Sequence, residues 1–409
     1  MRCGSNPDDG ATLPQNTFMS LISIDQAWAI IADAAGPLAG ETIALSDAAG
    51  RVLAAPVTAT FDSPRSAVST MDGYAVRDGD GPILRLVGTS AAGAKFTGGV
   101  GEGDAVRIFT GAALPDGATR VVIQENVTAD GDRITINQTS VATFVRQRAS
   151  DFAIGDEVVA SGSLLTPGAL VAAAGAGASD VAVTRRPRVL TIATGDELRP
   201  VGSALDPEHI PDSLAPGLLA LIAAMGAEML GHQLIGDDLP ALEAAAAAAV
   251  QRCDLLVVTG GASVGARDHA KAMFAPLGLE LLFSKVAIKP GKPVWLGRVG
   301  DTWVMGLPGN PSSAMVTARL LLAPLVARLL GQQYPAPIDW LTLPLAASLP
   351  TTDDRETFIR ATLGSAGLTP LANQDSGGQR ALGLARWLIR CPAGQAPLDP
   401  GTLVQAIAF

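Results

Sequence analysis

The spacing of apolar residues changes along the chain, and each change predicts a different kind of element. Residues 22–35 carry apolar side chains at helical spacing, with Ser23 as the expected N-cap. From Leu84 to Ile136, short alternating or continuous apolar runs are separated by Gly, Pro, Asp and Thr, which predicts strands joined by turns. We therefore expect a mixed N-terminal domain that contains an inserted β-barrel or sandwich. A helix that begins at Pro167 would close the insertion.

A strand–helix alternation begins after the basic linker 184–188. Its order is a strand at 189–194, a helix at 213–225 ended by Gly226, a strand at 227–235, an Ala-rich helix from Pro240 to Arg252, a strand at 255–259, a helix at 268–277, a strand-like run at 280–288, a strand from Asp301 and a last helix from Pro311 to about Leu330. This alternation predicts a parallel, doubly wound sheet with ligand-binding loops at its carboxyl edge.

The 409 residues are too many for one ordinary core and are expected to form several domains. We predict a multidomain protein of the α/β plus β class. The expected parts are a polar tail (1–18), a discontinuous N-terminal mixed domain (19–80 and 146–186), an inserted small β domain (81–145), a doubly wound α/β domain (187–331) and a C-terminal all-β domain (335–409).

Charge and hydropathy narrow the range of partners. The formal net charge of −10 argues against nucleic acid or an anionic membrane surface as the main partner. The first ten residues contain no apolar run of the kind found in a secretory signal. The most apolar stretch, 320–330, is interrupted by Pro324 and Arg328 and is shorter than the ~20 residues of a membrane span. We therefore expect a soluble, cytoplasmic protein with no nucleic-acid or membrane partner.

The cysteines and histidines offer little for metal or disulfide chemistry. Cys3, Cys253 and Cys391 are odd in number and far apart, which favours free thiols in a reducing compartment. The three histidines, His209, His232 and His269, lack metal-site spacing and are best interpreted as surface or hydrogen-bonded residues.

Four motifs in the predicted α/β domain lie where a strand gives way to a loop. They are TGDEL (194–198), TGGASVG (259–265) followed by Asp268, KPGKP (289–293) and LPGNPSS (307–313). In an open α/β sheet, ligands bind outside the carboxyl ends of the strands, where these loops are expected to converge.

The chemistry of these motifs suits an anionic ligand. Glycines at 260–265 let backbone N–H groups approach an oxyanion without interference from a Cβ. Asn310 as N-cap with Pro311 at the first helical position leaves free N–H groups at the start of a helix, which favours phosphate. Lys289 and Lys292 add positive charge. The carboxylates suited to Mg²⁺ and a substrate phosphate are Asp196, Glu197, Asp237 and Asp268.

Each motif also has a simpler interpretation. TGDEL alone fits an acidic helix start, a Gly-Gly pair is usually a tight turn, and KPGKP fits a solvated hairpin tip. A Walker-type GxxxxGK[ST] loop is absent from the sequence. Because carboxylates, lysines, glycine loops and a Pro-capped helix occur together in one α/β domain, the combination favours chemistry on an anionic ligand.

With further motifs outside this domain, the chain resembles the MoeA/gephyrin family of molybdenum-insertion enzymes from about Met19 onward. The further motifs are 69–76 (STMDGYAV), 107–112 (RIFTGA) with Gln124 and Glu125, and Arg146 and Arg148 before Asp151. The resemblance implies an elongated four-domain homodimer in which the MDGYA region of one subunit faces the pterin-binding α/β domain of the other. The implied reaction combines adenylyl-molybdopterin with molybdate, uses Mg²⁺, and yields molybdenum cofactor and AMP.

The resemblance also implies roles for individual residues. Asp72, Thr110 and Asp151 would line the cleft from the N-terminal side, and Glu197, Asp237 and Asp268 would hold Mg²⁺ and the phosphoanhydride. The residues expected to cradle the pterin phosphate are Gly260, Gly261, Ser263, Gly265, Pro308, Gly309, Asn310 and Ser312. Lys289, Lys292, Arg360 and Ser376 would receive molybdate. Lysine and metal electrostatics can stabilise the developing charge without a protein nucleophile, and the predicted catalytic set is Asp72, Thr110, Asp151, Glu197, Lys289 and Lys292.

The chain departs from the family pattern at four places: Ala67-Val68, Ala149-Ser150, the stretch 211–214 (PDSL), where a substrate-facing Asn becomes Leu214, and His269. Alternatives to the transferase are a catalytically weakened cofactor carrier or scaffold of the same family, and a pterin adenylyltransferase. The extra domains disfavour the adenylyltransferase. Expected partners include molybdopterin adenylyltransferase and downstream proteins that accept the cofactor.

Overall fold

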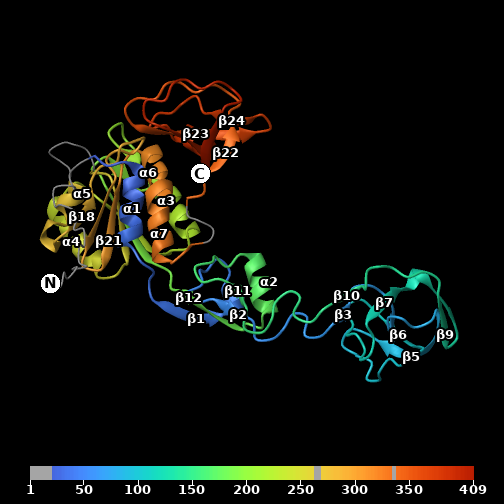
Figure 1. Cartoon of the computed structure of the whole chain (residues 1–409). Helices are drawn as coiled ribbons and strands as arrows, with labels where there is room; N and C mark the ends of the chain where they lie inside the picture. The colour runs from blue at the N-terminus through green and yellow to red at the C-terminus, as the bar shows by residue number, and fades with distance from the viewer. Residues whose placement is uncertain (1–20, 262–268, 334–337) are drawn as a thin grey trace, which may run out of the picture.

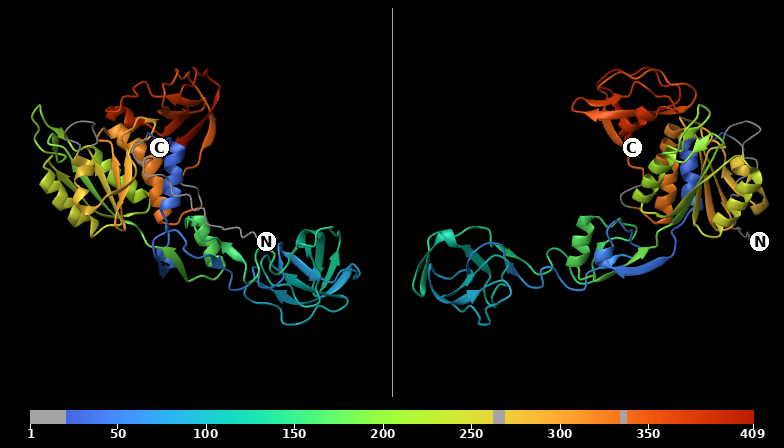
Figure 2. Two further views of the ribbon diagram at one scale, coloured as in Figure 1. Left: turned by 60° about the vertical axis from the view of Figure 1, so that its left-hand side comes forward. Right: turned by 180° about the vertical axis from the view of Figure 1, so that it is seen from behind.

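The computed structural model describes residues 21–261, 269–333 and 338–409. It is an elongated molecule with four parts: an α/β domain, a C-terminal β domain beside it, a middle module and a distal β lobe (Figure 1). Two further views show the same order, with the middle module between the α/β domain and the lobe (Figure 2).

The α/β domain is built on a six-stranded sheet in the order β16-β13-β17-β21-β20-β18. Four strands are parallel: β13 (Arg188–Thr194), β16 (Glu228–Ile235), β17 (Leu255–Thr259) and β21 (Thr302–Leu307). The other two, β20 (Trp295–Val299) and β18 (Glu280–Phe283), run antiparallel at one edge. Strands β13, β17 and β21 are almost wholly buried, because helices cover both faces of the sheet.

One face of the sheet packs against α3 (Leu214–Ala224) and a long apolar helix, and the other against α4 (Leu239–Val250) and α5 (His269–Ala272). The long helix comprises α6 (Pro311–Thr317), a π-helical stretch (Ala318–Leu322) and α7 (Ala323–Leu329). This helix is long and apolar enough to cross a membrane, but 78% of its most apolar window is buried inside the domain. It is therefore a core helix, and the doubly wound prediction is confirmed.

Helix α1 (Ile24–Ala34) confirms the predicted helix and its N-cap, because Gln26 N donates to Ser23 Oγ at 3.1 Å in a capping box. We assigned this helix to the N-terminal domain (19–80). In the structure Ile24, Ala27 and Ile31 instead belong to the core that α1 shares with the α/β domain. The N-terminal segment thus adds a helix to the α/β domain before the chain enters the middle module.

The middle module holds two antiparallel strand pairs and a helix. The pairs are β1 (Gly40–Ala44) with β12 (Asp180–Thr184), and β2 (Val57–Thr58) with β11 (Glu157–Val159). Helix α2 (Pro167–Gly175) starts at the predicted Pro167, with Thr166 as N-cap. A short 3₁₀ turn (Leu45–Asp47) completes the module, which has its own small core.

The distal β lobe is joined to the module by the ribbon of β3 (Val68–Ser69) and β10 (Val145–Arg146). Its sheet has the order β7-β4-β6-β5-β9-β8, formed by β4 (Gly73–Val76), β5 (Ile83–Ser90), β6 (Asp104–Ile108), β7 (Arg120–Ile123), β8 (Val127–Asp130) and β9 (Arg133–Ile136), with a 3₁₀ turn at Gln124–Asn126. Because β4 lies between β7 and β6, the lobe begins before the predicted boundary at residue 81. The boundary moves to the β3–β10 ribbon.

The C-terminal domain is β-rich, as predicted. Its sheet contains β22 (Leu341–Pro344), β23 (Glu356–Gly364), β24 (Gly367–Pro370), β25 (Trp387–Cys391) and β26 (Leu403–Ala408). It also contains a short helix, α8 (Gln379–Leu384), that we did not predict. Strand β19 (Ile288–Lys289) leaves the α/β domain and pairs with β23, so the KPGKP loop joins the two domains.

Two local predictions in the α/β domain differ from the structure, and three strands of the domain were not predicted. The helix expected at 268–277 is helical at His269–Ala272 and 3₁₀ at Ala275–Leu277 among its described residues. The strand expected at 280–288 ends at Phe283, and β20 was missed. The short β14 (Leu198–Arg199) and β15 (Ile210–Pro211) pair in a loop above the sheet.

Candidate functional site

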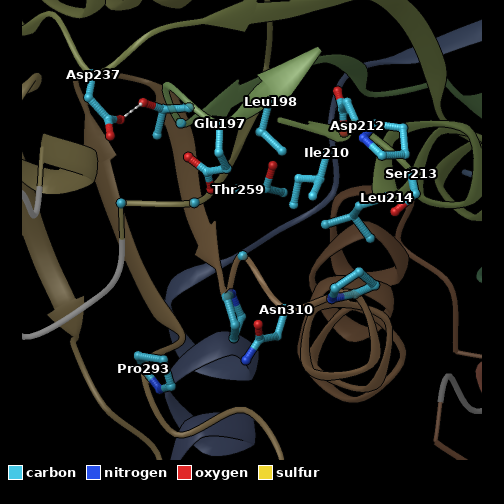
Figure 3. Close-up of a pocket in the computed structure, with 18 of the residues that line it drawn as sticks. Glu197, Leu198, Ile210, Asp212, Ser213, Leu214, Asp237, Thr259, Pro293 and Asn310 are labelled. Carbon is cyan, nitrogen blue, oxygen red and sulfur yellow. Dashed lines mark hydrogen bonds between the residues drawn. The ribbon is translucent and has the colours of Figure 1, made fainter. Parts of the chain in front are cut away.

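A cavity of about 700 Å³ opens at the carboxyl ends of β13, β17 and β21, where the sequence motifs were expected to converge. Its volume suits a ligand of cofactor size. Figure 3 shows side chains reaching it from several loops. The cavity is lined by Thr194, Gly195, Glu197, Leu198, Ile210, Pro211, Asp212, Ser213, Leu214, Asp237, Thr259, Gly260, Gly261, Lys285, Lys292, Pro293, Pro308, Gly309, Asn310, Pro311 and Gln379.

Two of the predicted carboxylates line one side of the cavity. Asp237 accepts a hydrogen bond from Thr194 Oγ1 at 2.7 Å (Figure 3), and its backbone N–H donates to Asp196 Oδ1 at 2.9 Å. Glu197 is exposed to the cavity, and its carboxylate folds over Gly195, where a Cβ would come within 2.7 Å of a carboxylate oxygen. Asp196 therefore positions the Asp237 loop, while Glu197 and Asp237 face the ligand space.

The chemistry of these donors fits Mg²⁺, which is bound by one or two carboxylates together with substrate phosphate. Within the described residues there is no group of three acidic, His or Cys side chains that could hold a metal. The third predicted ligand, Asp268, lies outside the described residues. A Mg²⁺ ion held at Glu197 and Asp237 could take further oxygen ligands from a substrate phosphate.

Backbone rather than side chains forms the floor of the cavity. Gly260 and Gly261 have positive φ angles of 89° and 57°, and a Cβ on Gly260 would come within 2.2 Å of the Thr194 carbonyl oxygen. Only glycine fits there, so the loop passes close to β13 with its backbone open to the cavity. The predicted contacts Ser263 and Gly265 lie outside the described residues.

The LPGNPSS motif begins the long core helix, as predicted, and Pro308, Gly309 and Asn310 line the cavity. Asn310 Nδ2 donates to Ser376 Oγ at 3.0 Å, and Ser312 N donates to the Ser376 carbonyl at 3.0 Å. Ser312 itself is buried. The start of α6 is therefore already held by the C-terminal domain.

Arg360 lies behind this contact rather than on the cavity wall. It is fully buried, and its guanidinium donates to Ser312 Oγ and, at 2.9 Å, to the Asp375 carbonyl. Gln374 accepts from its backbone N–H at 3.0 Å. Burial lowers the pKa of the Arg360 guanidinium. In this arrangement Arg360 orders the loop that carries Ser376, and Ser376 lies beside the cavity.

The lysines are arranged differently from what their spacing suggested. Lys292 lines the cavity, but Lys289 Nζ pairs with Asp353 of the C-terminal domain at 2.9 Å. A second cavity lysine is Lys285, because Val286 N donates to the Lys292 carbonyl at 3.0 Å and the loop folds back on itself. The positive charge of the cavity thus comes from Lys285 and Lys292.

The predicted residues of the N-terminal half lie far from this cavity in the same chain. Asp72 and Thr110 meet on the distal lobe, where Asp72 Oδ1 accepts from Thr110 N at 2.7 Å and from Thr110 Oγ1 at 2.8 Å. The backbone N–H of Thr110, and then its hydroxyl, hold the pKa of Asp72 below its ordinary value. Asp151 is exposed on the chain that returns from the lobe, with its N–H bonded to the Ser63 carbonyl at 3.0 Å.

An aromatic and cationic surface flanks Asp72 on the lobe. The guanidinium of Arg107 lies 5.0 Å from the ring centre of Tyr74 and 5.1 Å from that of Phe109, and donates to Gln124 Oε1 at 2.6 Å. This packing fixes Arg107 beside the ionised Asp72.

The motifs did not indicate three cavity residues: Asp212, Lys285 and Gln379. Gln379 reaches from the C-terminal domain and donates to Ser213 Oγ at 2.9 Å. Asp212 follows a two-residue strand and Lys285 lies in a folded loop, so neither belongs to a regular pattern. The positions of Lys285 and Gln379 depend on tertiary folding, whereas Asp212 lies in the stretch 211–214 that comparison with the family pattern had already placed near the substrate.

Three family models match the chain. They are described as the MoeA N-terminal region (domains I and II) at residues 22–177, a probable molybdopterin binding domain at residues 190–328, and the MoeA C-terminal region (domain IV) at residues 342–409. The models follow one another in the same order as the structural parts.

Two curated relatives that align with most of the chain have the same name. A molybdopterin molybdenumtransferase from Haemophilus influenzae is 36% identical over 319 residues, which are 76% of this chain and 79% of the relative. Another from Staphylococcus aureus (strain MSSA476) is 31% identical over 382 residues, or 90% of each chain.

Solved structures share the fold. A molybdopterin biosynthesis MoeA protein from Pyrococcus horikoshii matches with a TM-score of 0.78 and 27% identity, covering 95% of this chain and 99% of that chain. A second structure of MoeA from the same organism, strain OT3, has a TM-score of 0.83 at 23% identity, with 95% and 100% covered, and supports the fold alone.

Proposed function

Because the chain belongs to the MoeA family of molybdopterin molybdenumtransferases, we propose that its α/β cavity binds adenylyl-molybdopterin while molybdate is inserted and AMP is released. The observation that carries this proposal is the meeting of Glu197, Asp237 and Lys292 around one cavity at the carboxyl ends of the parallel strands. An anionic, phosphorylated pterin needs such a mixture of cations, carboxylates and open backbone.

The phosphate groups of the substrate would lie against the glycine loop and the start of α6. Gly260 and Gly261 offer backbone there, together with Pro308, Gly309 and Asn310. Ser263 and Gly265 are proposed to extend the same loop contact, and Ser312 supports it from behind. Glu197, Asp237 and Asp268 would hold Mg²⁺, which would neutralise charge on the scissile phosphoanhydride.

Molybdate would be received at the opposite, lysine-bearing wall. Lys292 and Lys285 are cations that face the cavity, and Ser376 offers a hydroxyl beside Asn310. Arg360 would act through the Ser376 loop, which it orders. Lys289 pairs with Asp353 at 2.9 Å, and we propose that it exchanges this partner for the incoming oxyanion.

The remaining residues would come from a second copy of the chain. Asp72, Thr110 and Asp151 lie on the lobe side of an elongated molecule, away from the cavity of their own chain. In a homodimer, the lobe of one subunit can cover the cavity of the other. Asp72 would then present an ionised carboxylate, already oriented by Thr110, to the reacting groups.

The proposed cellular setting follows from this chemistry. A molybdopterin adenylyltransferase must supply the activated pterin, and proteins that accept molybdenum cofactor must take up the product. Such an enzyme would operate in the cytoplasm. A carrier without turnover is not favoured, because the curated relatives are transferases.

A single-turnover assay tests the transferase. Adenylyl-molybdopterin, Mg²⁺ and molybdate are mixed with the protein, and AMP release and reconstitution of a molybdenum-dependent apo-enzyme are followed. We expect molybdate-dependent AMP release that yields active cofactor. Lys292→Ala should slow it by about 100-fold, because a cation aimed at developing charge is removed.

The matched control is Lys95→Ala, an exposed lysine of the distal lobe that pairs with Asp116 at 3.0 Å, and it should leave the rate unchanged. Pterin binding without AMP release in the wild-type protein would refute the transferase. Equal rates for Lys292→Ala and the wild type would refute the assignment of the lysine wall.

A further inference from the structure

A line of three hydrogen-bonded side chains reaches the cavity from the sheet. Thr191 on β13 and His232 on β16 are direct neighbours in the parallel ladder, and Thr191 Oγ1 lies 2.8 Å from His232 Nδ1. His232 Nε2 lies 2.7 Å from Asp212 Oδ2. The line ends at Asp212, which is on the cavity wall.

The carboxylate end of this line has a defined direction. A carboxylate only accepts, so His232 Nε2–H donates to Asp212, and the Thr191 hydroxyl lies within hydrogen-bond distance of Nδ1 on the other side of the ring. Asp212 Oδ1 also accepts from Ala215 N at 3.3 Å. These two bonds hold the carboxylate at both oxygens and use two of its roughly four acceptor positions. Asp212 lines the cavity, and about two of its acceptor positions remain beyond these two bonds.

The cavity wall around Asp212 differs from the wall that holds the other charged groups. Leu198, Ile210 and Leu214 line the cavity near Asp212 and give it an apolar rim. Figure 3 shows Asp212 on the same side as Ile210 and Leu214, away from Asp237. This side is suited to a flat heterocycle whose edge carries N–H groups, and unsuited to a phosphate.

The substrate of the proposed function has two heterocycles, and their hydrogen-bonding edges differ. The 2-amino-4-oxo ring of a pterin places two N–H donors side by side, which a carboxylate can accept together. Adenine alternates donor and acceptor along its edges, so a carboxylate would face a lone pair. Building on the proposed function, we propose that Asp212 recognises the N–H edge of the pterin and that His232 is the positioning residue that holds it.

The test separates pterin recognition from recognition of the adenylate. The Michaelis constant for adenylyl-molybdopterin and its dissociation constant are measured beside the dissociation constant of AMP alone. Asp212→Asn keeps an acceptor for His232 but turns an amide donor toward the pterin N–H groups. We expect its Michaelis constant to rise about 10- to 100-fold, because a charge-assisted pair is lost. The affinity for AMP and the turnover at saturating substrate should stay unchanged.

Two substitutions of His232 test the positioning role. His232→Leu should raise the same Michaelis constant, whereas His232→Gln, which restores an N–H donor toward Asp212, should recover most of the loss. The control is Gln233→Leu, the next residue of β16, whose side chain is exposed, and it should behave as the wild type.

Three outcomes would overturn this assignment. They are an unchanged Michaelis constant in Asp212→Asn, a parallel loss of AMP affinity, which would place the adenylate at Asp212, and equal behaviour of His232→Leu and His232→Gln. Failure of the proposed function is distinguishable from these. If the wild-type protein binds adenylyl-molybdopterin without turnover, the proposed transferase activity is refuted. The dissociation constants of the wild type and of Asp212→Asn then still test the assignment of Asp212. If the wild-type protein does not bind adenylyl-molybdopterin, both the proposed function and the assignment of Asp212 are refuted.

Discussion

The α/β cavity and the distal lobe carry the two halves of the proposed site, and they are built in different ways. The cavity is a concave space of about 700 Å³ between loops that are anchored on buried parallel strands. The lobe instead presents Asp72 and Thr110 on its surface, flanked by Arg107 and its aromatic partners. The cavity therefore offers an enclosed space for the proposed substrate, whereas the lobe offers oriented side chains on its surface.

This difference indicates that the two halves of the proposed site would have different roles. Asp72 is held in one orientation and ionised before any substrate arrives, since Thr110 supplies two hydrogen bonds to one oxygen. Such pre-orientation favours catalysis over binding. The two halves lie far apart along an elongated chain (Figures 1 and 2), so in the proposed arrangement the lobe of a second copy would complete the site.

The largest effect is expected when a mutation inactivates one of the two halves of the proposed site. Asp72→Ala and Glu197→Ala should each lower AMP release by at least about 100-fold. After subunit exchange of an equal mixture, about half of the dimers would be mixed, and each would contain one intact site between subunits. Activity should therefore return to about a quarter of the wild-type value, by the symmetry of a two-fold dimer. Mixing two lobe variants, Asp72→Ala with Thr110→Ala, is the control and should restore nothing.

That experiment has a clear contrary result. If the Asp72→Ala and Glu197→Ala mixture stays inactive although subunits exchange, the site does not lie between two copies of the chain. Exchange itself is followed by mass spectrometry of differently tagged subunits.

The second effect concerns the ion pairs of Asp254, which lie where the chain enters the α/β domain from the middle module. Asp254 in the α/β domain accepts two hydrogen bonds from Arg185, at 2.7 and 2.8 Å, and one from the backbone N–H of Arg188 at 2.8 Å. Arg185 belongs to the linker from the middle module, and Arg188 is the first residue of β13. Asp254→Ala should lower the free energy of unfolding by about 1–2 kcal/mol, because Asp254 is mostly buried but the side chains of Arg185 and Arg188 are partly exposed to water. Urea unfolding measures it.

The pH dependence of this effect has a defined sign. Burial acts to raise the pKa of Asp254, but the bonds from Arg185 and Arg188 outweigh it and hold the pKa below its ordinary range. A lowered folded pKa stabilises the protein above the unfolded value of about 3.9 and loses that contribution as the pH falls through the folded value. The difference between wild type and Asp254→Ala should therefore be full near neutral pH and shrink in acid. Asp301→Ala, whose exposed side chain lies 3.6 Å from Arg298, should change stability by less than about 0.5 kcal/mol.

The smallest effect concerns the reactivity of two buried thiols, which lie outside the distal lobe. Cys253 and Cys391 lie in the α/β and C-terminal domains, and the lobe contains no cysteine. Burial raises the pKa of both thiols to about 11. In a Cys3→Ser background, alkylation of the native protein at pH 8 should be at least about 100-fold slower than that of a free thiol, because little thiolate forms. Rapid alkylation would mean that the domains around these thiols open readily, and would contradict the burial of Cys253 and Cys391.

Much of the fold could be predicted from local patterns. The helix at Ile24–Ala34 with its Ser23 cap, the start of α2 at Pro167, the end of α3 before Gly226 and the parallel strands all follow from periodicity, capping and turn residues. The placement of α1 on the α/β domain did not follow, since an amphipathic face shows that a helix is buried but not what covers it. For the same reason, the pattern of residues in β4 did not show that this strand pairs with β6 and β7, and the predicted boundary at residue 81 left it outside the lobe.

The sequence by itself determined which chemistry the site can carry and at which edge of the sheet it lies, because strand–loop motifs and parallel strands bring glycine backbone, carboxylates and a helix start together by local rules. Only the tertiary structure decided which lysine faces the cavity, that Arg360 is buried behind the Ser376 loop, and that His232 orients Asp212. Those positions depend on how irregular loops fold back and how separate domains pack. Such contacts join residues far apart in the chain and leave no period in the sequence.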